Sequence, residues 1–468
     1  MKRLILFCAM LCSTVLTTSA QRISGTWHGA MRLNSIELNL VLHLDGDSTC
    51  TVDSPDQGAR GIAGTVKEIT AEKVDVAFPM LMAAYTAELK DGKLVGTFKQ
   101  RGFSVPLTLE PGDLVRQRPQ TPQPPFPYET REVTFSHDSI TLAGTLTLPA
   151  RTNGKNVSPS PFGEGRGGAS LPLRGGDGGG LCLLLVTGSG LQDRDETIFD
   201  HKPFAVIADY LARHGIATLR YDDRGFGQST GDPTQCTTAD FAEDAAAGIA
   251  FLRSLKATPQ PIQKKKGQRS KKASPTGGGL EGALFSKVGI LGHSEGGSIA
   301  FMLGSKQLVD CIVALAAPGI KGDTLLVEQT NALLRLSGQP ANLTLRTMRI
   351  MMAAQETTPW YNYFMEYDPS ADIAATRCPV LALNGSLDSQ VLPDSNLGAI
   401  RQLSNLRPWN GSLPMGEGGG RGFSKLYPGL NHLFQHAQTG TATEYGNIEE
   451  TISEEVLSDI ATWLKRLF

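Results

Sequence analysis

The sequence has little net charge and, beyond its first twenty residues, no long hydrophobic run. Its 468 residues carry 44 Lys and Arg against 46 Asp and Glu, a formal net charge of −2. This balance gives the chain no overall electrostatic reason to bind nucleic acid. Because no later apolar run approaches the ~18 residues that cross a bilayer, we expect no stable membrane insertion.

Cysteine is also scarce. Outside the first twenty residues the chain has Cys50, Cys182, Cys236, Cys311 and Cys378. Their wide spacing matches neither a zinc motif nor a disulfide framework. Cys182 and Cys311 lie in apolar, strand-like runs, where cysteine usually serves as a small buried hydrophobe. We therefore expect no metal and no cofactor.

The first 20 residues have the pattern of a secretory signal peptide. Lys2 and Arg3 are followed by an apolar run from Leu4 to Leu16 and then by the small residues of 18–20. A basic start, a short apolar stretch and small residues before a cleavage point are typical of such signals. The pattern predicts an exported protein, periplasmic or secreted.

Residues 21–113 alternate between short apolar and polar runs that are broken by turn signals. Asp45-Gly46 and Asp91-Gly92 are dipeptides typical of hairpin turns. This region is predicted to be a small antiparallel β domain. The proline-rich stretch over 114–128 predicts an extended linker after it.

From residue 129 onward, predicted strands and helices alternate. A hairpin over 131–148 is followed by continuous apolar strands such as Leu181–Thr187 and Ile216–Asp222, with helical segments between them. Fully apolar strands that alternate with helices indicate a mostly parallel sheet covered by helices on both faces. Residues 129–468 are thus predicted to form one α/β domain, with a helical cap near 319–375.

Three glycine-rich segments interrupt this alternation. They lie near 154–180, 257–285 and 408–424, and each combines serine and proline with a cluster of glycines. Glycine at this density cannot hold a packed helix or strand. The segments are predicted to be inserted surface loops.

The pattern Gly-x-Ser-x-Gly occurs twice, and its context separates the two copies. The copy around Ser229 is followed by Asp232-Pro233, which starts a turn, so Ser229 is interpreted as a loop residue. The copy around Ser294 lies between an apolar strand and an apolar helix. A sharp turn between strand and helix lifts the serine oxygen above the sheet as a nucleophile. The residues predicted to shape that turn are Gly292, His293 and Gly296.

A serine nucleophile needs a histidine base and a carboxylate that orients the histidine. In the chain order Ser, acid, His, Asp388 follows one predicted strand and His432 follows the next. Asp394 is an alternative acid further from its strand, and His436 is an alternative histidine one helical turn beyond His432. Asp388 and His432 are the favoured pair.

When the serine attacks a carbonyl group, the carbonyl oxygen becomes an oxyanion, which needs two hydrogen-bond donors. The N–H of Glu295, directly after the nucleophile, is predicted to be one. The second should come from the loop after Leu181–Thr187, with Ser189 as first choice and Gly190 as second.

Together these motifs resemble exported bacterial esterases of the α/β-hydrolase superfamily, near its serine aminopeptidase-like and dienelactone hydrolase-like branches. The resemblance rests on TGSGLQDRDE (187–196), HKPF (201–204), LRYDDRGFGQSTG (219–231), GHSEGG (292–297), LNGSLDSQV (383–391), YPGLNHLFQ (427–435) and DSPDQG (53–58). It implies an α/β-hydrolase fold and hydrolysis of short acyl or acetyl esters through an acyl-enzyme.

The substrate itself stays open. Acylated glycans are candidate ester substrates, and a peptidase or amidase with the same fold is the alternative activity, since fold alone does not fix the reaction. A non-catalytic binding protein is a third reading. In the predicted cap, Trp360, Tyr361 and Phe364 are candidates for the wall of a substrate pocket.

Overall fold

A computed structural model describes residues 22–33, 36–45, 49–57, 59–150, 180–256, 283–353, 357–411 and 422–468. The predicted signal peptide and most of the three glycine-rich segments lie outside the described residues. The chain forms two compact units, Met1–Val115 and Arg116–Phe468. No helix in the described part of the chain has both the length and the apolar character needed to cross a membrane.

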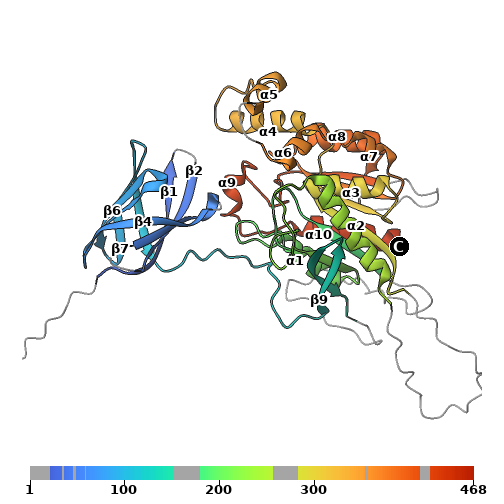
Figure 1. Ribbon diagram of the computed structural model, residues 1–468, viewed down its shortest axis with the longest axis horizontal. Coiled ribbons are helices and arrows are strands. Elements are labelled where there is room, and N and C mark those ends of the chain that lie inside the picture. Colours follow the sequence, from blue (N-terminus) through green and yellow to red (C-terminus); the bar gives the residue numbers. More distant parts are fainter. Residues whose placement is uncertain are drawn as a thin grey trace, which may run out of the picture. The chain divides into compact units, whose positions relative to one another are not determined.

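The first unit is a closed antiparallel barrel, drawn in blue in Figure 1. Its strands are β1 (Gly25–Leu33), β2 (Ile36–Leu44), β3 (Thr49–Ser54), β4 (Ala59–Ile69), β5 (Lys73–Phe78), β6 (Ala83–Lys90), β7 (Lys93–Gln100) and β8 (Phe103–Pro111), with the short helices η1 (Pro55–Gln57) and η2 (Pro79–Leu81). Closure comes from β1 and β8, where Trp27 pairs with Pro111. The interior is filled by alternate strand residues such as Val74 and Val76, which are fully buried. The predicted antiparallel β domain is confirmed.

The second unit contains a nine-stranded sheet in the order β16-β17-β15-β14-β13-β11-β12-β10-β9. Its strands are β9 (Glu129–His137), β10 (Ile140–Leu148), β11 (Gly180–Val186), β12 (Ala217–Tyr221), β13 (Phe285–His293), β14 (Ile312–Leu315), β15 (Val380–Gly385), β16 (Arg407–Pro408) and β17 (Gly422–Tyr427). From β12 to β16 all neighbouring strands pair in parallel, and the β9–β10 hairpin joins them antiparallel at one edge. The predicted mostly parallel sheet is therefore correct.

Helices cover both faces of this sheet (Figure 1). They are α1 (Pro203–Arg213), α2 (Thr238–Ser254), α3 (Glu295–Ser305), α4 (Gly322–Leu336), α5 (Leu345–Ala353), α6 (Pro359–Glu366), α7 (Ser370–Ala375), α8 (Pro393–Leu403), α9 (Ala442–Tyr445) and α10 (Glu454–Leu467). Leu184 and Val186 of β11 pack in the core shared with α2, α3, α7 and α8. Leu183 and Leu185 point to the opposite face, where α1 and α10 pack. Alternating apolar residues of one strand thus hold both helical layers.

The predicted cap contains α4 to α7, between β14 and β15. Helix α4 packs against α5 and α6, whereas α7 packs against α3 and α8 of the sheet unit. Ile373 of α7 is fully buried in the main core. The cap proper therefore comprises α4, α5 and α6, and α7 belongs to the body.

Several predicted boundaries shift in the structure. Described strands reach the edges of the predicted glycine-rich segments: Gly180 belongs to β11, Phe285 to β13 and Gly422 to β17. The proline-rich stretch packs on the second unit from Arg116 onward. Its anchor is Arg118, whose guanidinium donates hydrogen bonds to three backbone carbonyls of that unit.

Candidate active site

Ser294 lies at a sharp turn between β13 and α3. Its backbone has φ 53° and ψ −120°, a conformation that non-glycine residues rarely adopt. The turn is held to the sheet because the Ser294 N–H donates a 2.8 Å hydrogen bond to the Leu315 carbonyl of β14. His293 and Glu295 are buried on either side, and Ser294 between them is partly exposed. This is the geometry of a nucleophile elbow.

Two glycines allow the elbow to be this tight. A Cβ at Gly292 would lie 2.0 Å from the Gly296 carbonyl oxygen, and a Cβ at Gly296 would lie 2.2 Å from the Val186 carbonyl oxygen of β11. Both neighbours are backbone atoms that cannot rotate away. The glycines are therefore required by the close approach of strand, turn and helix.

His432 and Asp388 come together beyond the ends of neighbouring strands β17 and β15. The His432 Nδ1–H donates to Asp388 Oδ2 at 2.8 Å, and both side chains are buried. The other carboxylate oxygen of Asp388 accepts the N–H groups of Gln390 and Val391, each at 2.8 Å. With Nδ1 carrying the proton, Nε2 of His432 is the ring nitrogen that can act as a base.

The alternative acid and histidine lie elsewhere. Asp394 is exposed in the first turn of α8. His436 is exposed and pairs with Glu450 at 2.8 Å. Ser229 is buried in a loop, where its Oγ donates to the Asp222 carbonyl and accepts the Ala143 N–H.

The histidine loop is attached to the elbow through His293. The His293 ring lies 4.7 Å from the His432 ring, centroid to centroid, and its Nε2–H donates to the His432 carbonyl at 3.1 Å. Its Nδ1 lies 2.9 Å from Glu196 Oε1. Burial alone lowers the pKa of His293, but the Glu196 carboxylate and the His432 carbonyl outweigh burial and raise the pKa above its ordinary value. A protonated ring can donate to both acceptors at once.

Glu196 also holds the loop that follows β11. The Gly188 N–H donates to Glu196 Oε1 at 2.8 Å, so this amide is already occupied. Gly188 lies close to Ser294, since a Cβ at Gly188 would lie 3.2 Å from Ser294 Cβ. The next two residues are the predicted oxyanion donors: Ser189 is exposed, and Gly190, with φ +95°, lines the adjacent cavity. The Glu295 N–H opens α3, where helices leave amides free.

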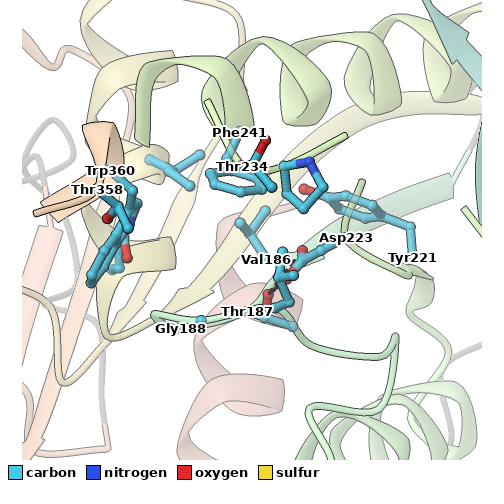
Figure 2. Close-up of a pocket in the computed structure, with 14 residues that line it drawn as sticks. Val186, Thr187, Gly188, Tyr221, Asp223, Thr234, Phe241, Thr358 and Trp360 are labelled. Carbon is cyan, nitrogen blue, oxygen red and sulfur yellow. Dashed lines mark hydrogen bonds between the residues drawn. The ribbon is translucent and has the colours of Figure 1, made fainter. Parts of the chain in front are cut away.

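A cavity of about 260 Å³ lies beside the elbow (Figure 2). Its lining is mainly apolar and comes from the sheet, α2, α3 and the cap: Val186, Thr187, Gly188, Gly190, Leu191, Tyr221, Asp223, Pro233, Thr234, Phe241, Glu295, Ile299, Thr358 and Trp360. Figure 2 shows Thr358 and Trp360 of the cap on one side, with Tyr221 and Asp223 across the cavity from them. Gly188 and Glu295, which line the cavity, are both close to Ser294, so a group bound in this cavity lies next to Ser294.

Two buried acids line this cavity, Asp223 and Glu295. Burial raises the pKa of Asp223 to about 8, the nearby acids Glu196 and Glu295 add to the rise, and hydrogen bonds from Thr187 and the Gln192 N–H oppose it. A carboxyl with this pKa is largely protonated at neutral pH.

The three aromatic residues of the cap that were predicted to line a substrate pocket differ in position. Trp360 lines the cavity, and its Nε1–H donates to Glu295 Oε1 at 2.9 Å. Phe364 stacks on Trp360 at 5.5 Å and Tyr361 contacts it edge-on at 6.3 Å, but neither lines the cavity. They support Trp360 rather than form the wall.

Sequence reasoning missed the roles of Asp223 and of the Glu196 carboxylate. Both residues lie within motifs noted in the sequence, 219–231 and 187–196. They lie in the loops after the neighbouring strands β11 and β12, but each loop carries further acids, and the sequence does not single these two out.

The fold and the site can now be compared with known proteins. The sequence model of the alpha/beta hydrolase family matches residues 183–436, which is more than half of the chain. The protein therefore belongs to the alpha/beta hydrolase family. The matched range contains Ser294, Asp388 and His432.

Individual relatives share 25% or less of their residues with this chain. Esterase EstD of Thermotoga maritima is 25% identical over 426 residues, covering 86% of this chain and 83% of the relative. The structure of the Pyrococcus furiosus esterase Pf2001 is 14% identical and covers 76% of this chain and 99% of its own, with a TM-score of 0.41. Est1E of Butyrivibrio proteoclasticus, solved with ferulic acid bound, is 16% identical and covers 70% of this chain and 99% of its own, with a TM-score of 0.40.

Proposed function

We propose that the protein is a serine hydrolase that cleaves carboxylic esters, with Ser294 as nucleophile, His432 as general base and Asp388 as the residue that orients the base. The observation that carries this proposal is the elbow at Ser294 together with the buried His432–Asp388 hydrogen bond of 2.8 Å. The similarity to Esterase EstD along most of both chains supports ester hydrolysis in particular.

The proposed reaction proceeds through an acyl-enzyme. His432 Nε2 takes the proton of Ser294 while the serine oxygen attacks the ester carbonyl. The N–H of Glu295 and a second amide, from Ser189 or Gly190, stabilise the developing oxyanion. His432 then gives the proton to the departing alcohol, and a water activated by the same histidine releases the acid.

The cavity beside Ser294 supports small substrate groups. Its volume of about 260 Å³ lies near the lower end of the range of ligand pockets. We therefore propose short acyl groups, or the acetyl and short acyl substituents of larger molecules such as glycans, as the substrates.

The direct test compares two serines. Ser294→Ala should lower turnover of p-nitrophenyl acetate by several powers of ten, because the nucleophile is lost. Ser229→Ala, in the other Gly-x-Ser-x-Gly, should keep most of the activity while melting at a lower temperature, because the buried Ala143 N–H loses its acceptor. Labelling by a fluorophosphonate with mass spectrometry should find the label on Ser294. A label on Ser229 and none on Ser294 would overturn the proposal.

A further inference from the structure

The cavity beside Ser294 contains a carboxylate oxygen that lacks a hydrogen-bond partner. Glu295 is 4% exposed, and its Oε1 accepts both the Thr238 hydroxyl at 2.5 Å and the Trp360 indole N–H at 2.9 Å. Among the described residues, none donates to its Oε2. Since Glu295 lines the cavity, this acceptor is available to whatever enters.

Asp223 adds a second acid to the same wall. It is 6% exposed and accepts hydrogen bonds from the Thr187 hydroxyl at 3.2 and 3.3 Å and from the Gln192 N–H at 2.9 Å. In the part of the chain that the structure describes, no lysine or arginine forms an ion pair with Asp223 or with Glu295. Buried carboxyl groups without a cation are costly to fold.

A purely structural role does not require this cost. The hydrogen bonds that Thr238 and Trp360 donate could be accepted equally well by a glutamine oxygen at position 295. An asparagine oxygen could likewise accept from the Gln192 N–H in place of Asp223. Two acids with no counter-charge, in a wall that is otherwise uncharged and mainly apolar, are arranged to receive donors from a bound molecule.

We propose that this cavity selects esters in which the group next to the scissile bond carries a hydrogen-bond donor, a hydroxyl or an amine, on a small and otherwise apolar skeleton. Glu295 and Asp223 are the specificity-determining acceptors. The inference rests on the proposed ester hydrolysis at Ser294 and names its substrate class. A cavity of about 150 Å³ already holds a benzene molecule, so about 260 Å³ has room for a single ring with a short chain and a polar end.

The test compares three methyl esters that differ only at the para position of a phenyl ring. The parent is methyl 3-phenylpropionate. The second ester carries a para hydroxyl group on the ring, and the third carries a para aminomethyl group. In a second series the same three ring-bearing groups form the alcohol part of the ester, and acetate is the acid part. The two series together allow either side of the ester to enter the cavity. In at least one series the donor-bearing substrates should exceed the parent in kcat/KM by roughly tenfold or more.

The variants Glu295→Gln and Asp223→Asn separate the two donor types. The kinetics are measured at about pH 9, above the pKa of about 8 of Asp223, so that each substitution removes a negative charge. Each variant should then lower the ratio of kcat/KM for the amine to that for the parent severalfold. The ratio of the hydroxyl substrate to the parent should fall less, because an amide oxygen still accepts. Both ratios are measured within one variant, so a general loss of turnover does not affect them. Glu243→Gln is the matched control, because Glu243 is exposed and pairs with Lys306 outside the cavity; its ratios should equal those of the wild type.

Each result is decisive. If the wild type hydrolyses the parents and the donor-bearing esters equally in both series, the inference is wrong and the proposed function stands. If both variants keep the wild-type ratios, the two acids do not select substrate and the inference is wrong. If no ester is hydrolysed and Ser294 is not labelled by a fluorophosphonate, the proposed function fails and the inference fails with it.

Discussion

At the scale of single residues, Asp388 is held by hydrogen bonds at both of its carboxylate oxygens. It accepts two backbone N–H groups and the His432 Nδ1–H, and among the described residues no other group accepts from that ring nitrogen. Asp388→Asn would offer His432 an amide N–H and stabilise the wrong tautomer. We expect turnover to fall by about 10⁴ with KM nearly unchanged.

The matched control for this change is Asp394→Asn, at the exposed start of α8. Steady-state kinetics of both variants on one p-nitrophenyl ester make the comparison. A larger loss in Asp394→Asn than in Asp388→Asn would mean that the acid has been placed in the wrong part of the loop.

Asp223 leads to a prediction about stability and pH. Burial raises its pKa from the ordinary value of 3.8 to about 8. Between these values the folded protein binds a proton that the unfolded chain releases, so Asp223 makes the fold less stable as the pH rises through this window. Asp223→Asn should therefore melt at a higher temperature than the wild type, and its advantage should be larger at about pH 9 than at about pH 5.

Asp310 should have the opposite effect on the pH dependence of stability. Burial alone would raise its pKa, but the Val288 N–H, Lys287 and Arg253 lower it below its ordinary value. Its contribution to stability is present above the unfolded pKa and is lost as the pH falls through the folded pKa. Asp310→Asn should cost stability near neutral pH and little in acid. Melting curves at about pH 5 and pH 9 test Asp223→Asn, and curves at about pH 7 and pH 2–3 test Asp310→Asn. A pH-independent effect of Asp223→Asn would contradict the prediction.

The sequence was informative about residues that occur in a local pattern and silent about residues that meet through the fold. The sharp turn at Ser294 is predictable because the strand, the turn and the helix around it are continuous in the chain. Glu196, Asp223 and Glu295 come from three different connections, and their side chains converge because β11, β12 and β13 are neighbours in the sheet. No spacing in the sequence encodes that convergence.

At the scale of elements, the turn between β13 and α3 depends on backbone contacts that a single methyl group would break. A Cβ at Gly296 would lie 2.2 Å from the Val186 carbonyl oxygen and 2.6 Å from that of Thr187. Gly296→Ala must therefore separate α3 from β11. We expect it to destabilise the protein by about 3 kcal/mol or more and to abolish turnover, because Ser294 moves with the helix.

Gly398→Ala is the control for the same substitution. Gly398 lies within α8, and a Cβ there would meet nothing within 4 Å. Alanine is the better helix former, so this variant should gain about 0.5–1 kcal/mol. Chemical denaturation of the two variants gives the comparison. Equal stabilities would show that the approach of α3 to β11 is looser than these distances indicate.

Helices and strands with a clear apolar pattern in the sequence are predicted well. Features that depend on pairing with a distant strand are not. The apolar run predicted as a strand over Leu181–Thr187 forms β11, and the helical segment that follows the strand Ile216–Asp222 forms α2, with Ala245 and Leu252 on its buried face. The closure of the barrel was not foreseen, because it requires β1 to pair with β8, about eighty residues away. The two-residue strand β16 was also missed, since it owes its existence to pairing with β17.

At the scale of the whole molecule, the two units have separate cores. The apolar residues inside the barrel form one cluster, and the two faces of the large sheet form two others. Every residue proposed to act in catalysis belongs to the second unit. A chain of residues 116–468 should therefore fold alone and keep the kcat/KM of the full protein on p-nitrophenyl acetate.

A second truncation, residues 129–468, tests where the second unit begins. It removes Arg118, whose guanidinium donates to the carbonyls of Phe199, Gly446 and Ile448. It also removes Gln120, which accepts the N–H of Thr451 and donates to the Ile452 carbonyl. These part-buried bonds tie together loops that are distant in the chain, and the truncation loses all of them.

We therefore expect 129–468 to melt several degrees below 116–468, at roughly 2–4 °C for each kcal/mol lost. Turnover should fall too, because the segments held by Arg118 and Gln120 lie next to His201. His201 Nε2 lies 3.0 Å from Gln435 Nε2, and Gln435 belongs to the loop that carries His432. Calorimetry and p-nitrophenyl acetate kinetics on both truncations decide the matter. Equal melting temperatures would show that residues 116–128 are a passive tether, and failure of 116–468 to fold would show that the second unit needs the barrel.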